Sequence, residues 1–283
     1  MKTATLLITC RDCRGIVAGM AQVLAARGLN ILDSDQHTDP LAGIFFQRIR
    51  FDLAGLVGDR AGLEAAIAAV AEPLRMDWRI AYAEVRPKVA LFVGKQDHCL
   101  HDLLQRHQAG ELAGEIVLVV SNHPDARAVA AFYGVDFHVF PITGDNKRAQ
   151  EQAELALLAE RRVELVVLAR YMQVLSGGFL AAFPGAVINI HHSFLPAFMG
   201  GNPYRQAFER GVKVIGATAH YVTEDLDEGP IIEQDVLRAS HRDTVEDLVR
   251  KGRDVERVVL SRAVRWHLEN RVLRYGNKTV VFA

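Results

Sequence analysis

Residues 187–196 read VINIHHSFLP, an apolar strand that runs directly into a cluster of polar side chains. The pattern predicts a strand over Val187–Ile190, and Pro196 breaks regular structure after it. Side chains two positions apart point to the same side of a strand, so we expect Asn189 and His191 to project together. In open parallel sheets, ligands bind beyond the carboxyl ends of the strands. The stretch therefore predicts a binding site at one edge of a sheet.

Apolar strands alternate with helical stretches on both sides of this segment. The alternation begins near Lys88 and favours a parallel sheet with helices on both faces. Further strands are expected at Val89–Val93, Ile116–Val120, Val163–Leu168, Val212–Val222 and Ile231–Leu237, and helices at Lys147–Glu160 and Asp243–Glu269.

The amino-terminal part of the chain follows a different order, which is strand, helix, strand, strand, helix, strand. Its first strand is expected at Thr3–Thr9 and its second helix at Arg60–Ala71. That order is typical of the ferredoxin-like arrangement. The segment Glu84–Pro87 is the expected linker, because polar residues there lead into a proline. We therefore expect two domains, at 1–84 and 85–283.

The composition indicates an ordinary globular protein, since half of the 283 residues are hydrophobic and 24% are charged. The net charge of -1 gives no electrostatic footprint for nucleic acid or a membrane surface. No apolar stretch approaches the ~20 residues of a membrane span. Three cysteines are too few for a disulfide framework, so we expect a soluble protein in a reducing cytoplasm.

A second polar cluster occupies the loop His220–Pro230, where four carboxylates crowd into five positions. Acidic runs of this kind are normally solvated turns. Spacing alone does not distinguish Asp227 from its neighbours.

A resemblance connects the two clusters. The stretches Asn189–His191, Ser193–Pro196 and Asp227–Ile231, together with Gly200, resemble the motifs of the folate-dependent formyltransferase family. Across the whole chain the likeness is to the deformylases of that family, which carry an ACT domain, a ferredoxin-like module that senses amino acids, before the hydrolase domain. The other matching strings are Asp12–Val17, Arg27–Ile31, Ser34–Thr38, Lys95–Leu100, Ser121–Pro124 and Leu168–Ser176.

The resemblance implies an α/β protein in which a ferredoxin-like ACT regulatory domain at 1–84 precedes a catalytic domain at 85–283. The second domain is expected to have the Rossmann-like formyltransferase fold with a mainly parallel sheet. Catalytic roles are implied for Asn189, His191 and Asp227. The expected walls of the substrate pocket are Met172, Gln173, Val174, Leu175, Thr223, Glu224, Asp225 and Leu226.

The implied activity is hydrolysis of 10-formyltetrahydrofolate to formate and tetrahydrofolate, which supplies formate for purine biosynthesis and balances one-carbon folate pools. Water attack on the formyl carbon creates an oxyanion, for which Asn189 and a protonated His191 offer donors. Asp227 favours the imidazolium form and orients the water or takes its proton. This scheme requires no metal and no redox cofactor. Because ACT modules generally pair and bind small amino acids, we also expect an amino-acid effector and a homo-oligomer.

Two other functions remain open. One is formyl transfer to an amine such as glycinamide ribonucleotide, but the relative with that activity has a glycine-rich phosphate loop where this chain reads Gly94–Cys99, with one glycine. The other is a non-catalytic sensor of folate or amino acids. The chain also departs from many relatives at Met199, where a lysine is expected.

Three weaker patterns point to other chemistries. Cys10 and Cys13 have the C-x-x-C spacing of metal or redox sites, without a visible second ligand pair. His98 and His101 are spaced more loosely than the i, i+4 pair of a zinc protease, so helix capping or pocket lining is preferred to a metal site. Ser193 lies beside two histidines, but no G-x-S-x-G elbow surrounds it.

Overall fold

The computed structural model describes residues 2–197 and 202–283, and the chain forms two compact units. The first unit holds Met1–Arg86 with Asn270–Tyr275 and Val280–Ala283, and the second holds Pro87–Glu269 with Gly276–Thr279. Met199 and Gly200, which the sequence singled out, lie outside the described residues.

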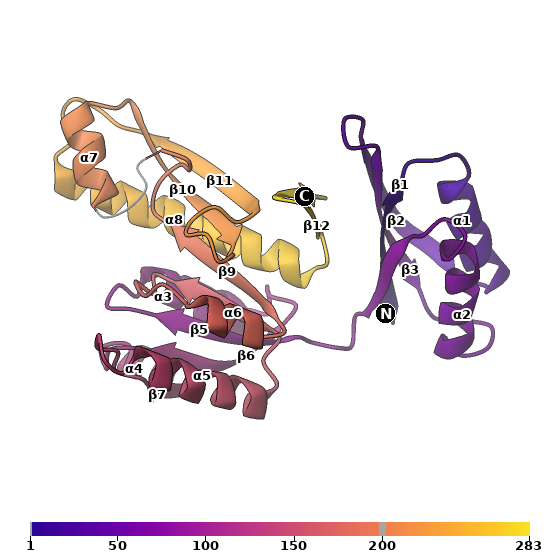
Figure 1. Cartoon of the computed structure of the whole chain (residues 1–283), viewed down its shortest axis with the longest axis horizontal. Helices are drawn as coiled ribbons and strands as arrows, with labels where there is room; N and C mark the ends of the chain where they lie inside the picture. The colour runs from indigo at the N-terminus through magenta and orange to yellow at the C-terminus, as the bar shows by residue number, and fades with distance from the viewer. Residues whose placement is uncertain (1, 198–201) are drawn as a thin grey trace. The chain divides into compact units, whose positions relative to one another are not determined.

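The first unit is an antiparallel four-stranded sheet with two helices on one face (Figure 1). Its elements are β1 (Thr3–Arg11), α1 (Ile16–Ala26), β2 (Asn30–Asp39), β3 (Ile44–Asp52), α2 (Arg60–Ala71) and β4 (Asp77–Tyr82). The strand order β2-β3-β1-β4 is ferredoxin-like, as the sequence predicts. Leu6 and Ile8 of β1 share a buried core with Met20 of α1 and Ile67 of α2, which holds the helices to the sheet.

The opposite face of this sheet is covered by residues from the end of the chain. There β12 (Val272–Tyr275) pairs with β13 (Lys278–Val281). Phe46 of β3 is fully buried with Val280 and Phe282, and the Tyr275 hydroxyl donates to Asp39 Oδ2 at 2.9 Å. The expected division at residue 84 left these residues with the second domain. Burial of the Phe46 face accounts for their place in the first unit.

The second unit is built on a seven-stranded, mainly parallel sheet in the order β11-β10-β9-β8-β5-β6-β7. Its elements are β5 (Lys88–Val93), α3 (His98–Gln108), β6 (Glu115–Ser121), α4 (Arg127–Phe132), β7 (Asp136–Val139), α5 (Lys147–Arg161), β8 (Leu165–Ala169), α6 (Gly177–Ala182), β9 (Ala186–His191), α7 (Pro203–Arg210), β10 (Val214–Tyr221), β11 (Ile231–Arg238) and α8 (Val245–Leu268). Strands β5 to β9 pair in parallel. Strand β10 then pairs antiparallel with β9, and β11 pairs antiparallel with β10.

Helices cover the faces of this sheet, as the continuous apolar strands predict. Phe92 of β5 packs with Leu158 of α5 and Phe179 of α6 in one core. Strand β8 is buried at every position, so both of its faces are covered. Within the described ranges, no helix combines the length and the apolar character needed to span a membrane.

Helix α8 brings one acidic side chain into the interior of the unit. The helix begins at a capping box in which Thr244 and Asp247 satisfy each other's backbone groups. Its buried stripe includes Val255, Val259 and also Glu256, which is 1% exposed. A buried carboxylate must be paired or hydrogen-bonded, so the surroundings of Glu256 bear on the chemistry of this unit.

Candidate active site

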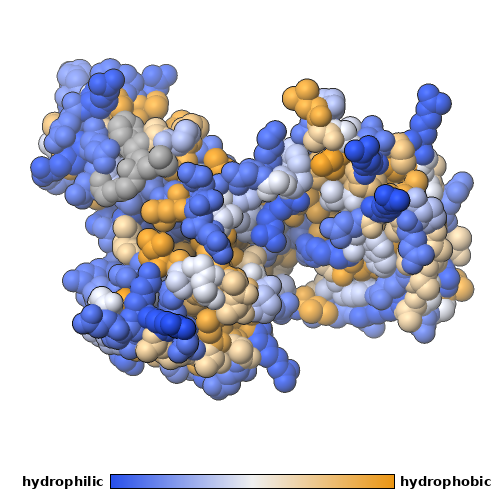
Figure 2. Space-filling model, in the orientation of Figure 1, coloured by the Kyte–Doolittle hydropathy of each residue, from blue (hydrophilic) through white to orange (hydrophobic). Residues whose placement is uncertain are grey.

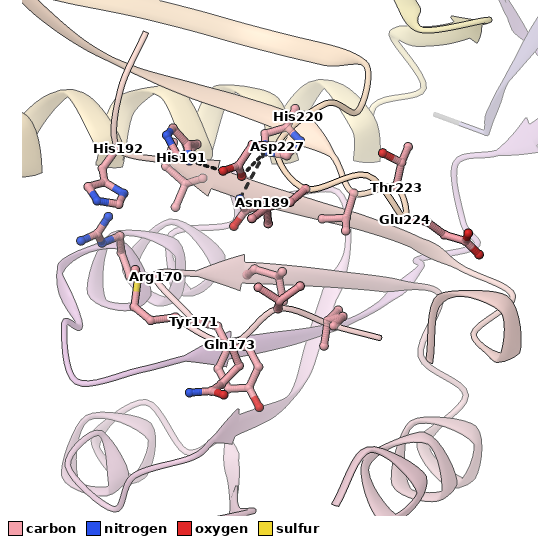
Figure 3. A pocket seen from close by; sticks show the side chains of 17 residues that line it. Arg170, Tyr171, Gln173, Asn189, His191, His192, His220, Thr223, Glu224 and Asp227 are labelled. Atoms are coloured by element: carbon pink, nitrogen blue, oxygen red, sulfur yellow. Dashed lines mark hydrogen bonds and ion pairs between the residues drawn. The ribbon is translucent and has the colours of Figure 1, made fainter. Parts of the chain in front are cut away.

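A cavity of about 210 Å³ lies at the carboxyl ends of β8 and β9, where the parallel sheet predicts a ligand site (Figure 3). Three segments form its walls: the chain after β8, the end of β9, and the acidic loop after β10. The lining residues are Leu168, Arg170, Tyr171, Met172, Gln173, Val174, Leu175, Asn189, Ile190, His191, His192, His220, Val222, Thr223, Glu224, Leu226 and Asp227.

The structure brings Asn189, His191 and Asp227 together at this cavity. The antiparallel pairing of β9 with β10 places His220 opposite Asn189, and the following loop returns Asp227 to the end of β9. His191 Nδ1 lies 3.1 Å from Asp227 Oδ2. The three side chains proposed from the two separate sequence clusters therefore share one wall (Figure 3).

His220 is a further member of this group that the sequence interpretation did not select. Its Nε2 lies 3.6 Å from Asp227 Oδ1 and 3.2 Å from Asn189 Nδ2, and its Nδ1 lies 2.9 Å from the carbonyl oxygen of Tyr221. His220 is placed at the site by the register of β10 on β9, and that register cannot be deduced from a single sequence.

Asp227 is held as a carboxylate in a largely buried place. Burial opposes its ionisation, but the hydrogen bonds from His191 and His220 outweigh burial and hold the pKa of Asp227 below its usual range. The negative charge therefore persists throughout the neutral range and faces two imidazole rings.

The other ring nitrogen of His191, Nε2, has no partner within residues 2–197 and 202–283. The side chain is 5% exposed, and its Nε2 atom is buried with no hydrogen-bond partner among the described residues. A buried polar atom without a partner is costly, and a bound ligand or water satisfies it. In its imidazolium form, His191 donates from Nδ1 to Asp227 and from Nε2 to whatever occupies that position.

The segment between β8 and α6 is braced from helix α5. The Tyr171 hydroxyl donates to Glu154 Oε1 at 3.0 Å, and the backbone N–H of Ser176 donates to Glu151 Oε1 at 2.9 Å. Lys147 Nζ adds a 2.6 Å bond to the carbonyl oxygen of Val174. Burial raises the pKa of Glu154 to about 7, against the opposing effect of the Tyr171 bond. This cavity wall is therefore fixed by charged groups beneath it.

Seven of the eight expected pocket residues line the cavity, and Asp225 does not. The carbonyl oxygen of Asp225 instead accepts a 3.1 Å bond from the Thr223 hydroxyl. Met172, Val174 and Leu226 are apolar yet 62%, 53% and 60% exposed, so the rim offers apolar contact to a ligand. Figure 2 shows hydrophobic surface in the middle of the second unit on the face turned to the viewer.

The alternative cysteine and serine chemistries receive no support from the surroundings of their residues. Burial raises the pKa of Cys10 to about 11, which keeps this thiol protonated, and Cys13 is exposed. The Ser193 hydroxyl donates to the carbonyl oxygen of Ala197 at 2.6 Å, so it is engaged with the backbone rather than with a histidine base.

One set of possible metal ligands occurs among the described residues, and it differs from the His98 and His101 pair considered in the sequence. His98, Cys99 and Glu256 place ligand atoms within 4.8 Å of one another. Burial raises the pKa of the Cys99 thiol well above its usual value, which disfavours the thiolate that a metal requires. The Glu256 oxygens are already engaged by His98 Nε2 at 2.7 Å and by the Tyr204 hydroxyl at 2.5 Å.

Known proteins of similar sequence and structure identify the relatives of this chain. A formyl transferase family model matches residues 87–264. The formyltetrahydrofolate deformylase of a Synechocystis species is 57% identical over 281 residues, covering 99% of each chain. The crystal structure of a formyltetrahydrofolate deformylase from Pseudomonas syringae has a TM-score of 0.97 and 46% identity, covering 100% of this chain and 95% of that one. A glycinamide ribonucleotide transformylase from Symbiobacterium toebii has a TM-score of 0.65 and 33% identity, and covers 70% of this chain and 95% of its own.

Proposed function

This chain belongs to the formyltetrahydrofolate deformylase family, and from that membership we propose that Asn189, His191 and Asp227 form its catalytic centre. The enzyme hydrolyses 10-formyltetrahydrofolate to formate and tetrahydrofolate. The observation that carries the proposed roles is the His191–Asp227 contact of 3.1 Å. On the other side of the ring, His191 Nε2 is buried and has no hydrogen-bond partner in the described part of the chain.

The proposed chemistry begins with water as the nucleophile. The oxygen of water bonds to the formyl carbon, and the former carbonyl oxygen becomes an oxyanion. The Asn189 amide and the His191 Nε2–H donate to that oxyanion, and each such donor contributes roughly 100-fold to 1,000-fold to the rate. Asp227, whose Oδ2 lies 3.1 Å from His191 Nδ1, orients that ring and accepts a hydrogen bond from the attacking water.

The second half of the reaction breaks the carbon–nitrogen bond. One proton of the attacking water is transferred to the folate nitrogen, which leaves as a neutral amine as the bond breaks. The other proton of that water is released to solvent, so the one-carbon fragment leaves as formate. The atoms balance with one water consumed, and no electrons are transferred to another molecule. The proposed roles therefore rest on charge and hydrogen bonding supplied by this chain's own residues.

The substrate is proposed to lie against the Met172–Leu175 and Thr223–Leu226 segments. Their exposed apolar side chains suit the flat ring system of a folate, and Gln173, Thr223 and Glu224 add polar groups at the same cavity. Asp225 is retained in this proposal as a residue of the loop, although it is not among the cavity's lining residues.

The direct experiment measures formate released from 10-formyltetrahydrofolate by the purified full chain, without any amine acceptor. We expect release in proportion to enzyme concentration. Rapid transfer to glycinamide ribonucleotide without release in its absence would instead select the transferase alternative. Binding of the folate with neither reaction would select the sensor alternative.

We also propose that the first unit is an ACT-type regulatory domain that binds a small amino acid and assembles the enzyme into a homo-oligomer. The ferredoxin-like strand order supports this assignment. Rates of formate release measured with each standard amino acid in turn, together with sedimentation of the full chain, test it. We propose that the enzyme acts in a reducing cytoplasm, for which the three free cysteines are the support. The formate that it releases is proposed to supply purine synthesis.

A further inference from the structure

A second cavity of the second unit, about 480 Å³ in volume, shares wall residues with the catalytic cavity. Arg170, Met172 and His192 line both cavities. The remaining wall of the second cavity is formed by Gln96, Asn202, Pro203, Tyr204, Arg205, Val245, Val249, Arg253 and Glu256. A small molecule formed in the catalytic cavity can therefore contact Arg170 and His192, which belong to both cavities.

Arg170 has one guanidinium nitrogen that none of the described residues engages in a hydrogen bond. The residue is 7% exposed, and its Nε and Nη2 atoms donate to Gln96 Oε1 at 3.2 and 2.9 Å. Its Nη1 atom is buried and has no hydrogen-bond partner among the described residues. Burying a charged donor without an acceptor is costly, so this nitrogen is poised for an anionic or carbonyl acceptor.

The backbone of Arg170 is held in an unusual conformation that fixes this side chain. Its φ of 63° lies in the left-handed region, which a non-glycine residue adopts only at a cost. Its carbonyl oxygen accepts a 3.1 Å bond from the N–H of Gly94, where an added Cβ would lie 2.7 Å from the same oxygen. Close backbone contact with Gly94 thus anchors Arg170 at the end of β8.

The charges around the second cavity favour an anion. Three arginines, Arg170, Arg205 and Arg253, line it against one carboxylate, Glu256. Glu256 lies 3.5 Å from Arg170 Nε but is shared with His98 and Tyr204. Burial and the Arg170 charge lower the pKa of His192 to about 3, so that ring stays neutral and adds no charge. The cavity therefore has a positive surplus.

We infer that Arg170, through its free Nη1 atom, binds the formate product as it leaves the catalytic centre. This inference rests on the proposed function, because hydrolysis converts a neutral formyl group into a carboxylate in a cavity that Arg170 lines. The Nη1 group carries two N–H donors, and a hydrogen bond from a guanidinium to a carboxylate is charge-assisted. In this proposal formate occupies the second cavity after the carbon–nitrogen bond has broken.

Inhibition of the full-length enzyme by added sodium formate tests the inference. We expect Arg170→Gln to raise the inhibition constant for formate by at least about tenfold, since a hydrogen bond to a charged group is lost. Arg250→Gln, on the same helix as Glu256 but outside the cavity lining, serves as the matched control and should leave that constant unchanged. Equal inhibition of wild type and Arg170→Gln by formate would overturn the inference.

A binding measurement separates this site from catalysis. Line broadening of ¹³C-formate should be seen with wild type and lost with Arg170→Gln, and thermal unfolding of the variant reports whether it is folded. Gln96→Glu is a second test, in which Arg170 is retained. A carboxylate at position 96 neutralises the charge of the guanidinium, so less of that charge is available to attract formate. This variant should also weaken formate binding, and unchanged binding in both variants would contradict the assignment.

The carboxylates of the folate's glutamyl tail share this chemistry, and kinetics distinguish them from formate. If Arg170 holds the tail instead, Arg170→Gln raises the KM for 10-formyltetrahydrofolate and leaves formate inhibition as in wild type, which overturns the inference. Absence of formate release by the wild type would refute the proposed function itself. If instead the wild type releases formate, and formate inhibits the wild type and Arg170→Gln equally, only the inference about Arg170 fails.

Discussion

The orientation of His191 depends on neighbours that come from different parts of the chain. Asp227 reaches its Nδ1 from a loop in which the aspartate itself has a φ of 58°, and the β9–β10 register supplies His220 beside them. The two-residue spacing of Asn189 and His191 could be interpreted from the strand pattern alone. The choice of Asp227 needed the family resemblance, and His220 carries no spacing that marks it.

Replacement of Asp227 by asparagine removes the negative charge that lies 3.1 Å from His191 Nδ1. We expect Asp227→Asn to lower kcat by roughly 100-fold to 10,000-fold, with KM changed by less than about twofold. Asp254→Asn, at an exposed position of α8 outside the lining of both cavities, should retain turnover. Steady-state formate release checks both variants, and near wild-type turnover by Asp227→Asn would refute its assigned role.

Asn189 is proposed to act chiefly when charge develops on the formyl oxygen. Asn189→Ala should therefore reduce kcat by roughly 100-fold to 1,000-fold while folate binding, measured by fluorescence titration, changes little. The reason is that its amide donor is worth most to the oxyanion and little to the neutral formyl group. A variant that loses binding and keeps kcat would show instead that Asn189 serves to hold the substrate.

Among the helices and strands, the sequence predicts best the long helices with a clear hydrophobic periodicity. The helix expected at Arg60–Ala71 has those bounds, and the one expected at Asp243–Glu269 is observed at Val245–Leu268. Strand β7 was not expected, because Asp136–Val139 is four residues long and only partly buried at the sheet edge. Short edge strands gain their structure from pairing with a neighbour, which leaves a weak local pattern.

The burial of Glu154 of α5 beneath the Tyr171 segment makes the stability of the protein depend on pH. Glu154 has a pKa of about 7 in the folded state against a usual 4.5, so between these values the folded protein holds a proton that the unfolded chain has lost. The free energy of unfolding therefore falls as pH rises through that range, by up to about 3 kcal/mol.

Glu154→Gln should abolish this part of the pH dependence, because the amide stays neutral. Urea unfolding of wild type and variant from about pH 5 to about pH 8 is the measurement, with the variant gaining relative stability toward the upper end. Glu160→Gln, at an exposed position on the same helix, should follow the wild-type curve. Parallel curves for wild type and Glu154→Gln would contradict the expected titration.

At the scale of the whole molecule, the sequence predicts two α/β units but not the route of the chain between them. The residues after α8 were assigned by position, as a continuation of the second domain. Their contribution to the first unit depends on contacts such as Arg48 Nε with the carbonyl oxygen of Asn270, 222 positions apart. Local periodicity carries no information about a partner at that distance.

Removal of one aromatic ring tests the contribution of these C-terminal residues to the first unit. Phe282→Ala should destabilise that unit by about 2 to 4 kcal/mol, since it opens the packing over Phe46. Unfolding followed by the fluorescence of Trp78 of β4, in a Trp266→Phe background, reports on the first unit alone. Phe282→Leu should cost less, and an unchanged midpoint for Phe282→Ala would show that this packing contributes little.

The late arrival of these residues also matters while the protein is being made. Tyr275 and its partner Asp39 are separated by 236 positions. At ribosomal rates this interval lasts on the order of tens of seconds. During this interval the hydrophobic face of the amino-terminal sheet around Phe46 is exposed, because Val280 and Phe282 have not yet been synthesised. We expect chaperone binding to protect the nascent chain most at this stage.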